Sequence, residues 1–353
     1  MTELLVQLVI AGIKAFIVIN TVLLAAAGLV YAERRIAAWI QDRIGPNRVG
    51  PFGLLQPFAD VIKLYFKEDL VPALADRAYH RLAPWISITV ALSLYAVIPV
   101  ADSIVIGGQR IPLSVAPNIN VGVLYILAMT SIGVYGIVLA GWASNNKYSL
   151  LGGLRSSAQM ISYELALGLS IVGVVMVAGT LDLAEIIARQ QHVWNIVYQP
   201  LGFLLFLIAS FAETNRAPFD LPEAEPELVG GYHTEYSGMK FGLFFLAEYS
   251  NMVVASLMMV VLFLGGWHVP FIPELPRWLG LQEGSIGLAL FQAGVTLAKT
   301  AALLFLFIWV RWTVPRFRYD QLMRLGWRVL LPLALLNIVL TGAVLLALEH
   351  VVR

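Results

Sequence analysis

The sequence contains no cysteine, and this absence excludes several kinds of chemistry from the chain. Disulfide bonds, iron–sulfur clusters held by cysteine thiolates, and catalysis by a thiol all require that residue. The five histidines are scattered along the chain, and no two of them have the spacing of metal ligands. We therefore expect no metal site in this chain.

Charged residues are also scarce. They make up 13% of the chain, whereas 59% of the residues are hydrophobic and the mean hydropathy is +0.80. Soluble domains contain about 25% charged residues. These values indicate an all-α polytopic membrane protein, with residues 1–353 forming one integral membrane domain. The net charge of +1 gives no indication of a nucleic-acid partner. The N-terminus lacks the basic region and the cleavage site of a signal peptide, so we expect its first apolar run to stay in the membrane.

Eight apolar runs approach the length of about 20 residues that a helix needs to cross a bilayer. They cover residues 8–31, 82–101, 119–142, 158–180, 196–212, 241–265, 288–310 and 327–348. The sequence therefore predicts about eight transmembrane helices.

The distribution of lysine and arginine predicts how these helices are oriented. The loops after the first, third, fifth and seventh runs hold 16 basic residues, whereas the other three loops hold only Arg110, Arg189 and Arg277. Because loops rich in lysine and arginine stay on the cytoplasmic side, we expect the N- and C-termini on the outer, periplasmic side. The long loops 33–81 and 213–240 are then cytoplasmic.

One segment of the first cytoplasmic loop, residues 57–67, has the pattern of an amphipathic helix. Proline can occupy the first helical position, as Pro57 would here. The apolar residues Phe58, Val61, Ile62 and Tyr65 then recur on one face. Such a helix lies in the membrane interface. It serves either as an anchor on the lipid surface or as one wall of a ligand entrance, and the pattern alone does not separate the two.

Several ionisable residues fall within the apolar runs or at their ends, and four of them are candidates for function. Glu164 and Glu248 lie six and seven residues into their runs, and Glu213 lies at the inner end of the fifth run. Their similar depths allow the three acids to converge. Lys299 lies near the middle of the seventh run. Charges at such depth are costly, so they usually face a polar interior and mark a proton path, although pairing for packing alone is the other interpretation.

The second cytoplasmic loop, residues 213–240, is strongly acidic. It contains Glu213, Asp220, Glu223, Glu225, Glu227 and Glu235. Three prolines prevent a continuous helix across it. In an extended chain the acids at 223, 225 and 227 point the same way. A solvated acidic loop is one interpretation, but the apolar residues between the acids favour a loop that packs against something.

Four long motifs resemble one known family, the H subunit (mitochondrial subunit 1) of respiratory complex I. They are ERRIAAWIQDRIGPNRVGPFGLLQPFADVIKLYFKED, GWASNNKYSLLGGLRSSAQMISYEL, AETNRAPFDLPEAEPELVGGYHTEYSGMKFGLFFLAEY and RWTVPRFRYDQLMRLGW. The resemblance runs from the first to the eighth apolar run and covers nearly all the cytoplasmic loops.

The resemblance implies a function. The chain is expected to be a membrane subunit of proton-pumping NADH:quinone oxidoreductase in the bacterial cytoplasmic membrane, where it forms most of the quinone tunnel. Quinone is then its substrate, and soluble cluster-bearing subunits, antiporter-like membrane subunits and lipid are its partners. FMN and the iron–sulfur clusters belong to partner subunits, and this chain is expected to contribute no catalytic residue and to bind no cofactor.

The same resemblance assigns individual residues. The residues implied near the quinone tunnel are Glu33, Arg34, Arg35, Ala59, Asp60, Phe245, Tyr249 and Arg311. The acids implied in coupling to the proton path are Glu164, Glu213 and Glu248, with Glu223, Glu225, Glu227 and Glu235 in the acidic loop. Lys299 joins this group because of its depth in the seventh apolar run, and not because of the resemblance. Some members carry an acid in the third span, where this chain has Thr130 and Ser131. Either the chain of acids is shorter here or another group replaces that acid.

Three other functions fit parts of this pattern. An equivalent foot subunit of a membrane-bound hydrogenase or plastid-type complex would use the same motifs with another electron donor. A stand-alone ion transporter would use the buried acids without a soluble arm. A non-catalytic scaffold would not need buried acids at matching depth on several helices.

Overall fold

The computed structural model describes residues 2–106, 108–117, 119–220, 229–270, 272 and 274–352. The long helices are α1 (Thr2–Ile40), α2 (Gln56–Phe66), α3 (Arg77–Ser93), α4 (Gly122–Ala143), α5 (Lys147–Ala178), α8 (Pro200–Glu213), α10 (Gly238–Phe263), α12 (Ile286–Thr313) and α14 (Leu331–Val352). The shorter helical elements are η1 (Pro51–Gly53), η2 (Leu94–Ala96), α6 (Leu183–Arg189), α7 (Asn195–Tyr198), η3 (Gly231–His233), α11 (Leu275–Trp278), α13 (Tyr319–Arg324) and the π-helical η4 (Leu325–Leu330).

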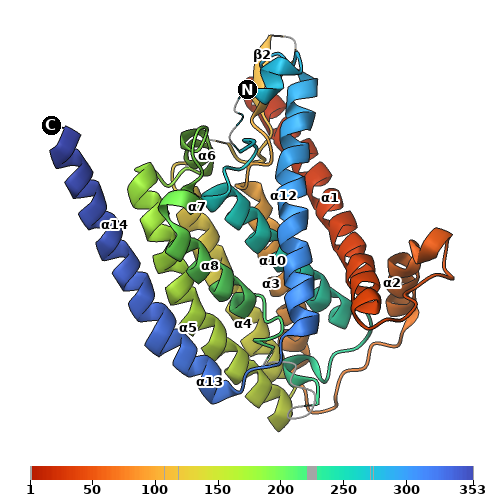
Figure 1. The fold of residues 1–353 in the computed structure, drawn as a ribbon. Coiled ribbons are helices and arrows are strands. Elements are labelled where there is room, and N and C mark those ends of the chain that lie inside the picture. Colours follow the sequence, from red (N-terminus) through yellow and green to blue (C-terminus); the bar gives the residue numbers. More distant parts are fainter. Residues whose placement is uncertain are drawn as a thin grey trace.

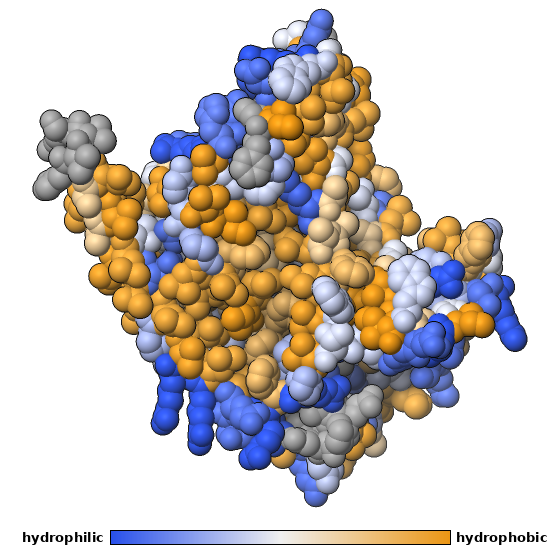
Figure 2. Space-filling model, in the orientation of Figure 1, coloured by the Kyte–Doolittle hydropathy of each residue, from blue (hydrophilic) through white to orange (hydrophobic). Residues whose placement is uncertain are grey.

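Six helices in the described part of the chain are long and apolar enough to cross a membrane. They are α1, α4, α5, α10, α12 and the continuous segment of α13, η4 and α14. Figure 2 shows a broad hydrophobic band across the middle of the molecule, with hydrophilic residues toward both ends. The chain is thus an all-α membrane protein, as composition predicts.

The other two predicted spans form shorter helices. Residues 82–101 fall on α3 and η2, which end before the run does. Residues 196–212 fall on α7 and α8, with a break in the helix at Gln199. Pro200 begins α8 because a proline lacks the N–H that a helix interior requires. A count of eight spans therefore stays a prediction.

Helix boundaries also differ from those predicted at other places: α5, for example, begins at Lys147, well before the predicted run 158–180. The first apolar run ends at Tyr31, but α1 continues to Ile40 and so includes Glu33, Arg34 and Arg35. The predicted amphipathic helix is present as α2, one residue earlier at each end. In addition, strands β1 (Ser103–Ile106) and β2 (Gln109–Pro112) form an antiparallel hairpin that the sequence analysis did not predict.

The helices run roughly side by side between two ends (Figure 1). The N-terminus, the C-terminus and the hairpin lie at one end, and α13 lies at the other. We call these the outer end and the inner end, after the orientation that the basic loops predict. Helix α2 projects sideways beyond α1 near the inner end, and α14 leans away from the bundle toward its C-terminus.

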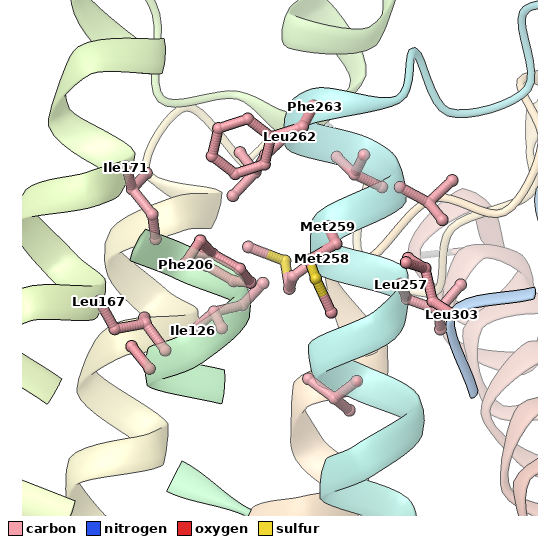
Figure 3. Packing of buried hydrophobic residues seen from close by; sticks show 14 of the residues in the cluster. Ile126, Leu167, Ile171, Phe206, Leu257, Met258, Met259, Leu262, Phe263 and Leu303 are labelled. Atoms are coloured by element: carbon pink, nitrogen blue, oxygen red, sulfur yellow. The ribbon is translucent and has the colours of Figure 1, made fainter. Parts of the chain in front are cut away.

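Buried hydrophobic residues form three clusters in the described part of the bundle, and the largest of them fills its outer half. Figure 3 shows Phe206 of α8, Leu167 and Ile171 of α5 and Met258 of α10 pointing toward one another. Residues Met259 to Phe263 of α10 are fully buried within this core. The acids of the predicted site lie nearer the inner end of the same helices, so the core closes off the outer side of the site.

Candidate functional site

A cavity of about 90 Å³ lies between α3, α4, α5, α8 and α10. Glu164 of α5, Glu213 at the end of α8 and Glu248 of α10 all line it. Counting residues from the inner boundary predicts that these three acids lie at a similar depth. The structure brings them to one cavity, because three helices run through the same level of the bundle.

The walls of this cavity are mostly apolar, with a few polar groups between them. Glu213 Oε2 and Asn251 Oδ1 are buried and have no hydrogen-bond partner among the described residues. A cavity needs about 10–15 Å³ of open space to hold one water, and a buried water needs two to four polar partners. The cavity therefore has room for water molecules that bridge the acids.

Next to this cavity lies a buried cluster of charged residues centred on Glu33 of α1. Arg216 Nη1, in the loop after α8, donates to Glu33 Oε2 over 3.2 Å, and Arg311 of α12 also donates to Glu33. The hydroxyl of Tyr249 donates to Glu33 Oε2 over 2.6 Å. Four segments that are distant in the sequence thus meet at one carboxylate.

Arg216 connects this cluster to the cavity. Its Nε lies 2.5 Å from Glu248 Oε1, while its Nη1 contacts Glu33. Only 3% of the Arg216 side chain is exposed. Burial alone would lower the pKa of Arg216, but the carboxylates of Glu248 and Glu33 raise it, so the guanidinium stays charged. Glu248 therefore belongs both to the cavity and to the charged cluster.

Pairing makes these buried charges tolerable. Two carboxylates, Glu33 and Glu248, face two guanidinium groups, Arg216 and Arg311, so the cluster is formally neutral. Removing one member of a buried pair costs about 3–5 kcal/mol, because the other charge is then left uncompensated. The ring of Tyr249 lies 4.3 Å from the Arg216 guanidinium and adds a cation–π contact.

The other residues implied near the quinone tunnel lie on α1, α2 and α10. Phe245 stacks edge-on against Tyr249, with ring centroids 5.0 Å apart. Arg34 of α1 pairs with Asp60 of α2 over 2.6 Å and so links the two helices. Ala59 lies beside Asp60 in α2 and is half-buried. Arg35 lies against Gly45, where an added Cβ would come within 3.1 Å of Arg35 Cδ.

The acidic loop is described only in part. Glu223, Glu225 and Glu227 lie outside the described residues. Glu235 lies after η3 and accepts a hydrogen bond of 2.6 Å from Asn146 Nδ2 at the start of α5. Asp220 is buried and pairs with Arg316 over 3.0 Å. The described parts of this loop therefore pack against the ends of other helices.

Lys299 lies apart from the three acids. Its Nζ donates to the carbonyl oxygens of Leu264, Gly266 and His268 over 2.6–2.8 Å. Leu264 is 16 residues after Glu248 in α10, or about 24 Å along a helix at 1.5 Å per residue. Lys299 is not among the residues that line the cavity. Its place in the proton path stays a prediction, and its contacts favour an anchoring role.

Two residues of the site were not identified from the sequence. Arg216 was noted only as a positive charge opposing the acidic loop, yet it contacts both Glu33 and Glu248. Its place directly after the fifth apolar run, among acids and next to buried helix ends, was the available signal. Ser131 of α4 was noted only where some relatives carry an acid, and it contacts Glu164.

Comparisons with known proteins agree on one family. The NADH dehydrogenase family model matches residues 13–342. The chain is 58% identical to NADH-quinone oxidoreductase subunit 8 of Rhodothermus marinus, with 92% of this chain and 94% of that protein covered. It is 53% identical to the H subunit of NADH-quinone oxidoreductase from Salinibacter ruber, with 95% of each covered. It is also 53% identical to the H 1 subunit of the same enzyme from Geobacter metallireducens, with 98% of this chain and 99% of that protein covered. The chain therefore belongs to this family and is an H-type membrane subunit of the proton-translocating NADH-quinone oxidoreductase, complex I.

Proposed function

We propose that this chain forms the quinone-access tunnel at the junction with the peripheral arm and couples quinone reduction to proton translocation through its buried carboxylates. The observation that carries the proposal is the position of Glu248. It lines the cavity with Glu164 and Glu213, and it also pairs with Arg216, which contacts Glu33. The carboxylate of Glu248 thus belongs both to the cavity and to the charged cluster around Glu33.

The residues on the quinone side are those around Glu33. Tyr249, Phe245 and Arg311 supply an aromatic wall and a positive charge, which suit a flat apolar ring that carries carbonyl oxygens. Helix α2, with Ala59 and Asp60, forms the mouth, tied to α1 by the pair of Arg34 with Asp60. Arg35 completes this region on α1. The apolar face of α2 includes Phe58 and Ile62, about half exposed, which suits contact with lipid tails.

Coupling between the two halves is electrostatic. Two unit charges 4 Å apart interact by about 4 kcal/mol at the effective dielectric constant of a protein near its surface. Quinone reduction takes up electrons and protons, so it changes the charge beside Glu33. Arg216 pairs with both Glu33 and Glu248, so a change of charge beside Glu33 changes how strongly Arg216 pairs with Glu248. Proton exchange between Glu248 and the neighbouring acids changes as a result.

The cavity acids continue this path. Glu213 and Glu164 are carboxyl groups in one small cavity that has room for water. A proton that reaches one acid can therefore pass to the other through bridging water molecules. Glu223, Glu225, Glu227 and Glu235 form the acidic loop that caps the tunnel on the cytoplasmic side.

We further propose the setting in which this path works. The chain crosses the bacterial cytoplasmic membrane in eight spans, with both termini on the periplasmic side. The inner end docks the soluble subunits that carry the quinone headgroup site and the clusters. The lateral faces contact small and antiporter-like membrane subunits, to which the proton signal passes.

Charge-neutral replacement of the acids tests this proposal in the intact complex. Glu213→Gln and Glu248→Gln are each expected to slow quinone-linked NADH oxidation about tenfold, since glutamine can neither take up nor release a proton, and tenfold corresponds to about 1.4 kcal/mol. NADH oxidation by a hydrophilic acceptor should be unchanged, because it bypasses the membrane. Glu185→Gln is the matched control, since that carboxylate is exposed and pairs with Arg189 at the outer end. Normal quinone-linked rates in both variants would contradict the proposal.

A further inference from the structure

Glu164 has a direct partner on the neighbouring helix. Ser131 Oγ of α4 lies in hydrogen-bond contact with Glu164 Oε1 of α5. The two helices pack closely below this level, since an added Cβ on Gly141 would come within 2.6 Å of the carbonyl oxygen of Ser149. The backbone thus fixes the spacing between the hydroxyl and the carboxyl group.

The hydroxyl of Ser131 has a second partner within its own helix. Ser131 Oγ lies 3.1 Å from the carbonyl oxygen of Leu127, one turn earlier. A serine hydroxyl has one hydrogen to donate and two lone pairs that accept. It can therefore donate to Leu127 while accepting from a protonated Glu164. Alternatively, it can turn and donate to an ionised Glu164.

Turning the hydroxyl leaves no acceptor without a donor. The hydroxyl of Thr130 lies 2.9 Å from the carbonyl oxygen of Leu127 and 3.1 Å from that of Ile126, and the helical N–H of Ser131 bonds to the Leu127 oxygen. A carbonyl oxygen has two lone pairs, so the Leu127 oxygen can accept from this N–H and from one hydroxyl at a time. Thr130 can donate to Ile126 while Ser131 donates to Leu127, and to Leu127 when Ser131 turns away. The hydrogen of Ser131 is therefore available to Glu164 at little cost.

We infer that Ser131 is a positioning residue, which holds the carboxyl group of Glu164 in one place in both of its protonation states through rotation of its hydroxyl. This inference rests on the proposed function of Glu164 as a proton-carrying group. A carboxyl group that keeps its place while it gains and loses a proton can exchange that proton with its neighbours without moving its side chain. The ionisable residues that line the cavity with Glu164 are Glu213, Glu248 and Tyr232.

The test compares two side chains of the same shape at position 131 in the intact complex. Ser131→Thr keeps the hydroxyl, whereas Ser131→Val replaces it with a methyl group. We expect Ser131→Val and Ser131→Ala to slow quinone-linked NADH oxidation about two- to tenfold, which corresponds to the loss of one hydrogen bond. Ser131→Thr should restore the rate. Ser170→Ala is the control, since the hydroxyl of Ser170 in α5 bonds to the carbonyl oxygen of its own helix at Leu167.

A double-mutant cycle with Glu164 separates this inference from the proposed function. Ser131→Val should have no further effect in a Glu164→Gln background, because the residue acts through Glu164. Equal slowing by Ser131→Val in both backgrounds would overturn the inference, as would a normal rate for Ser131→Val beside a slow Glu164→Gln. A normal rate for Glu164→Gln would overturn the role of Glu164 itself, and this inference with it.

Discussion

Arg216 is the residue at which the quinone side and the cavity meet. It is buried between Glu33 and Glu248, and its planar guanidinium presents donors in two directions, Nη1 toward Glu33 and Nε toward Glu248. A lysine carries the same charge on a single nitrogen and cannot reproduce this fork. The shape of Arg216, as well as its charge, therefore supports the link.

Replacing Arg216 separates its charge from its shape. Arg216→Lys should give an assembled complex whose quinone-linked turnover is reduced about tenfold, because one ammonium group cannot hold both carboxylates in place. Arg216→Met should reduce the amount of assembled complex, because it leaves Glu33 and Glu248 without their shared partner at a cost of about 3–5 kcal/mol. Arg189→Lys is the control, since Arg189 is exposed. Assembly is measured by native gel and turnover by NADH oxidation; full turnover in Arg216→Lys would show that charge alone suffices.

For individual residues, the sequence predicted the depth of the buried acids but not which side chains contact them. Depth along an apolar run depends only on counting residues, so Glu164, Glu213 and Glu248 were placed at one level. The pairing of Arg216 depends on how the loop after α8 turns back between α1 and α10, which no local pattern encodes. The contact of Ser131 with Glu164 likewise depends on the rotation of α4 against α5.

Helix α10 is the element that holds the site in place. Its inner half supplies Phe245, Glu248 and Tyr249, and its outer half is buried in the core. Beyond its outer end, Lys299 of α12 donates to three carbonyl oxygens, the first at the C-cap Leu264. A cation at the carboxyl end of a helix is favourable because carbonyl groups there lack partners within the helix. Burial and the nearby Lys299 lower the pKa of His268 to about 4, so that His268 stays neutral beside this cation.

Lys299→Met tests whether this residue anchors α10 or carries protons. We expect the half-life of the complex on heating to shorten about tenfold, because three carbonyl oxygens lose a charged donor. Turnover per assembled complex should be unchanged at the growth temperature. Lys14→Met is the control, since Lys14 makes one hydrogen bond, of 3.3 Å, to the carbonyl oxygen of Ser114. Lost turnover with normal heat stability would place Lys299 in the proton path instead.

Helix identity was more predictable than helix ends. Hydropathy located a helix for each of the eight apolar runs, but α1 continues nine residues past Tyr31 to Ile40. Glu33 pairs there with Arg216 and Arg311, and Arg34 pairs with Asp60, so their polarity did not mark the end of the helix. The hairpin of β1 and β2 was missed because it is short and its edge pairs with the backbone of Gly284, far away in the chain.

Across the whole molecule, contacts at the inner end tie together the loops 33–81 and 213–240, which the sequence predicts to be cytoplasmic. Ser237 Oγ accepts from the N–H of Leu70 and donates to the carbonyl oxygen of Glu68, and Lys240 pairs with Asp69. Gly238 has a φ of +56°, and an added Cβ would lie 3.3 Å from the carbonyl oxygen of Lys67, so glycine suits this position. The end of α2, at the proposed tunnel mouth, is therefore fixed to the start of α10, which carries the site.

The helical membrane architecture follows from composition and from the spacing of apolar runs. The contact between the Glu33 cluster and the cavity does not. Scarce charge and long apolar runs predicted a helical membrane protein, and the motifs in the long polar loops predicted its family. The connection of the Glu33 cluster to the cavity arises only when α1, α8, α10 and α12 pack together. That connection is the basis of the proposed coupling.

A double-mutant cycle on Glu33 and Glu248 tests this connection most directly. Glu33→Gln, Glu248→Gln and the double variant are compared by the quinone-linked NADH oxidation rate of the intact complex. Since both carboxylates hold the same guanidinium of Arg216, the effects should fall short of additivity by about 0.5–3 kcal/mol, so the double variant should be little slower than the slower single variant. Additive effects within about 0.5 kcal/mol would show that the two carboxylates act independently and would contradict the proposed coupling through Arg216.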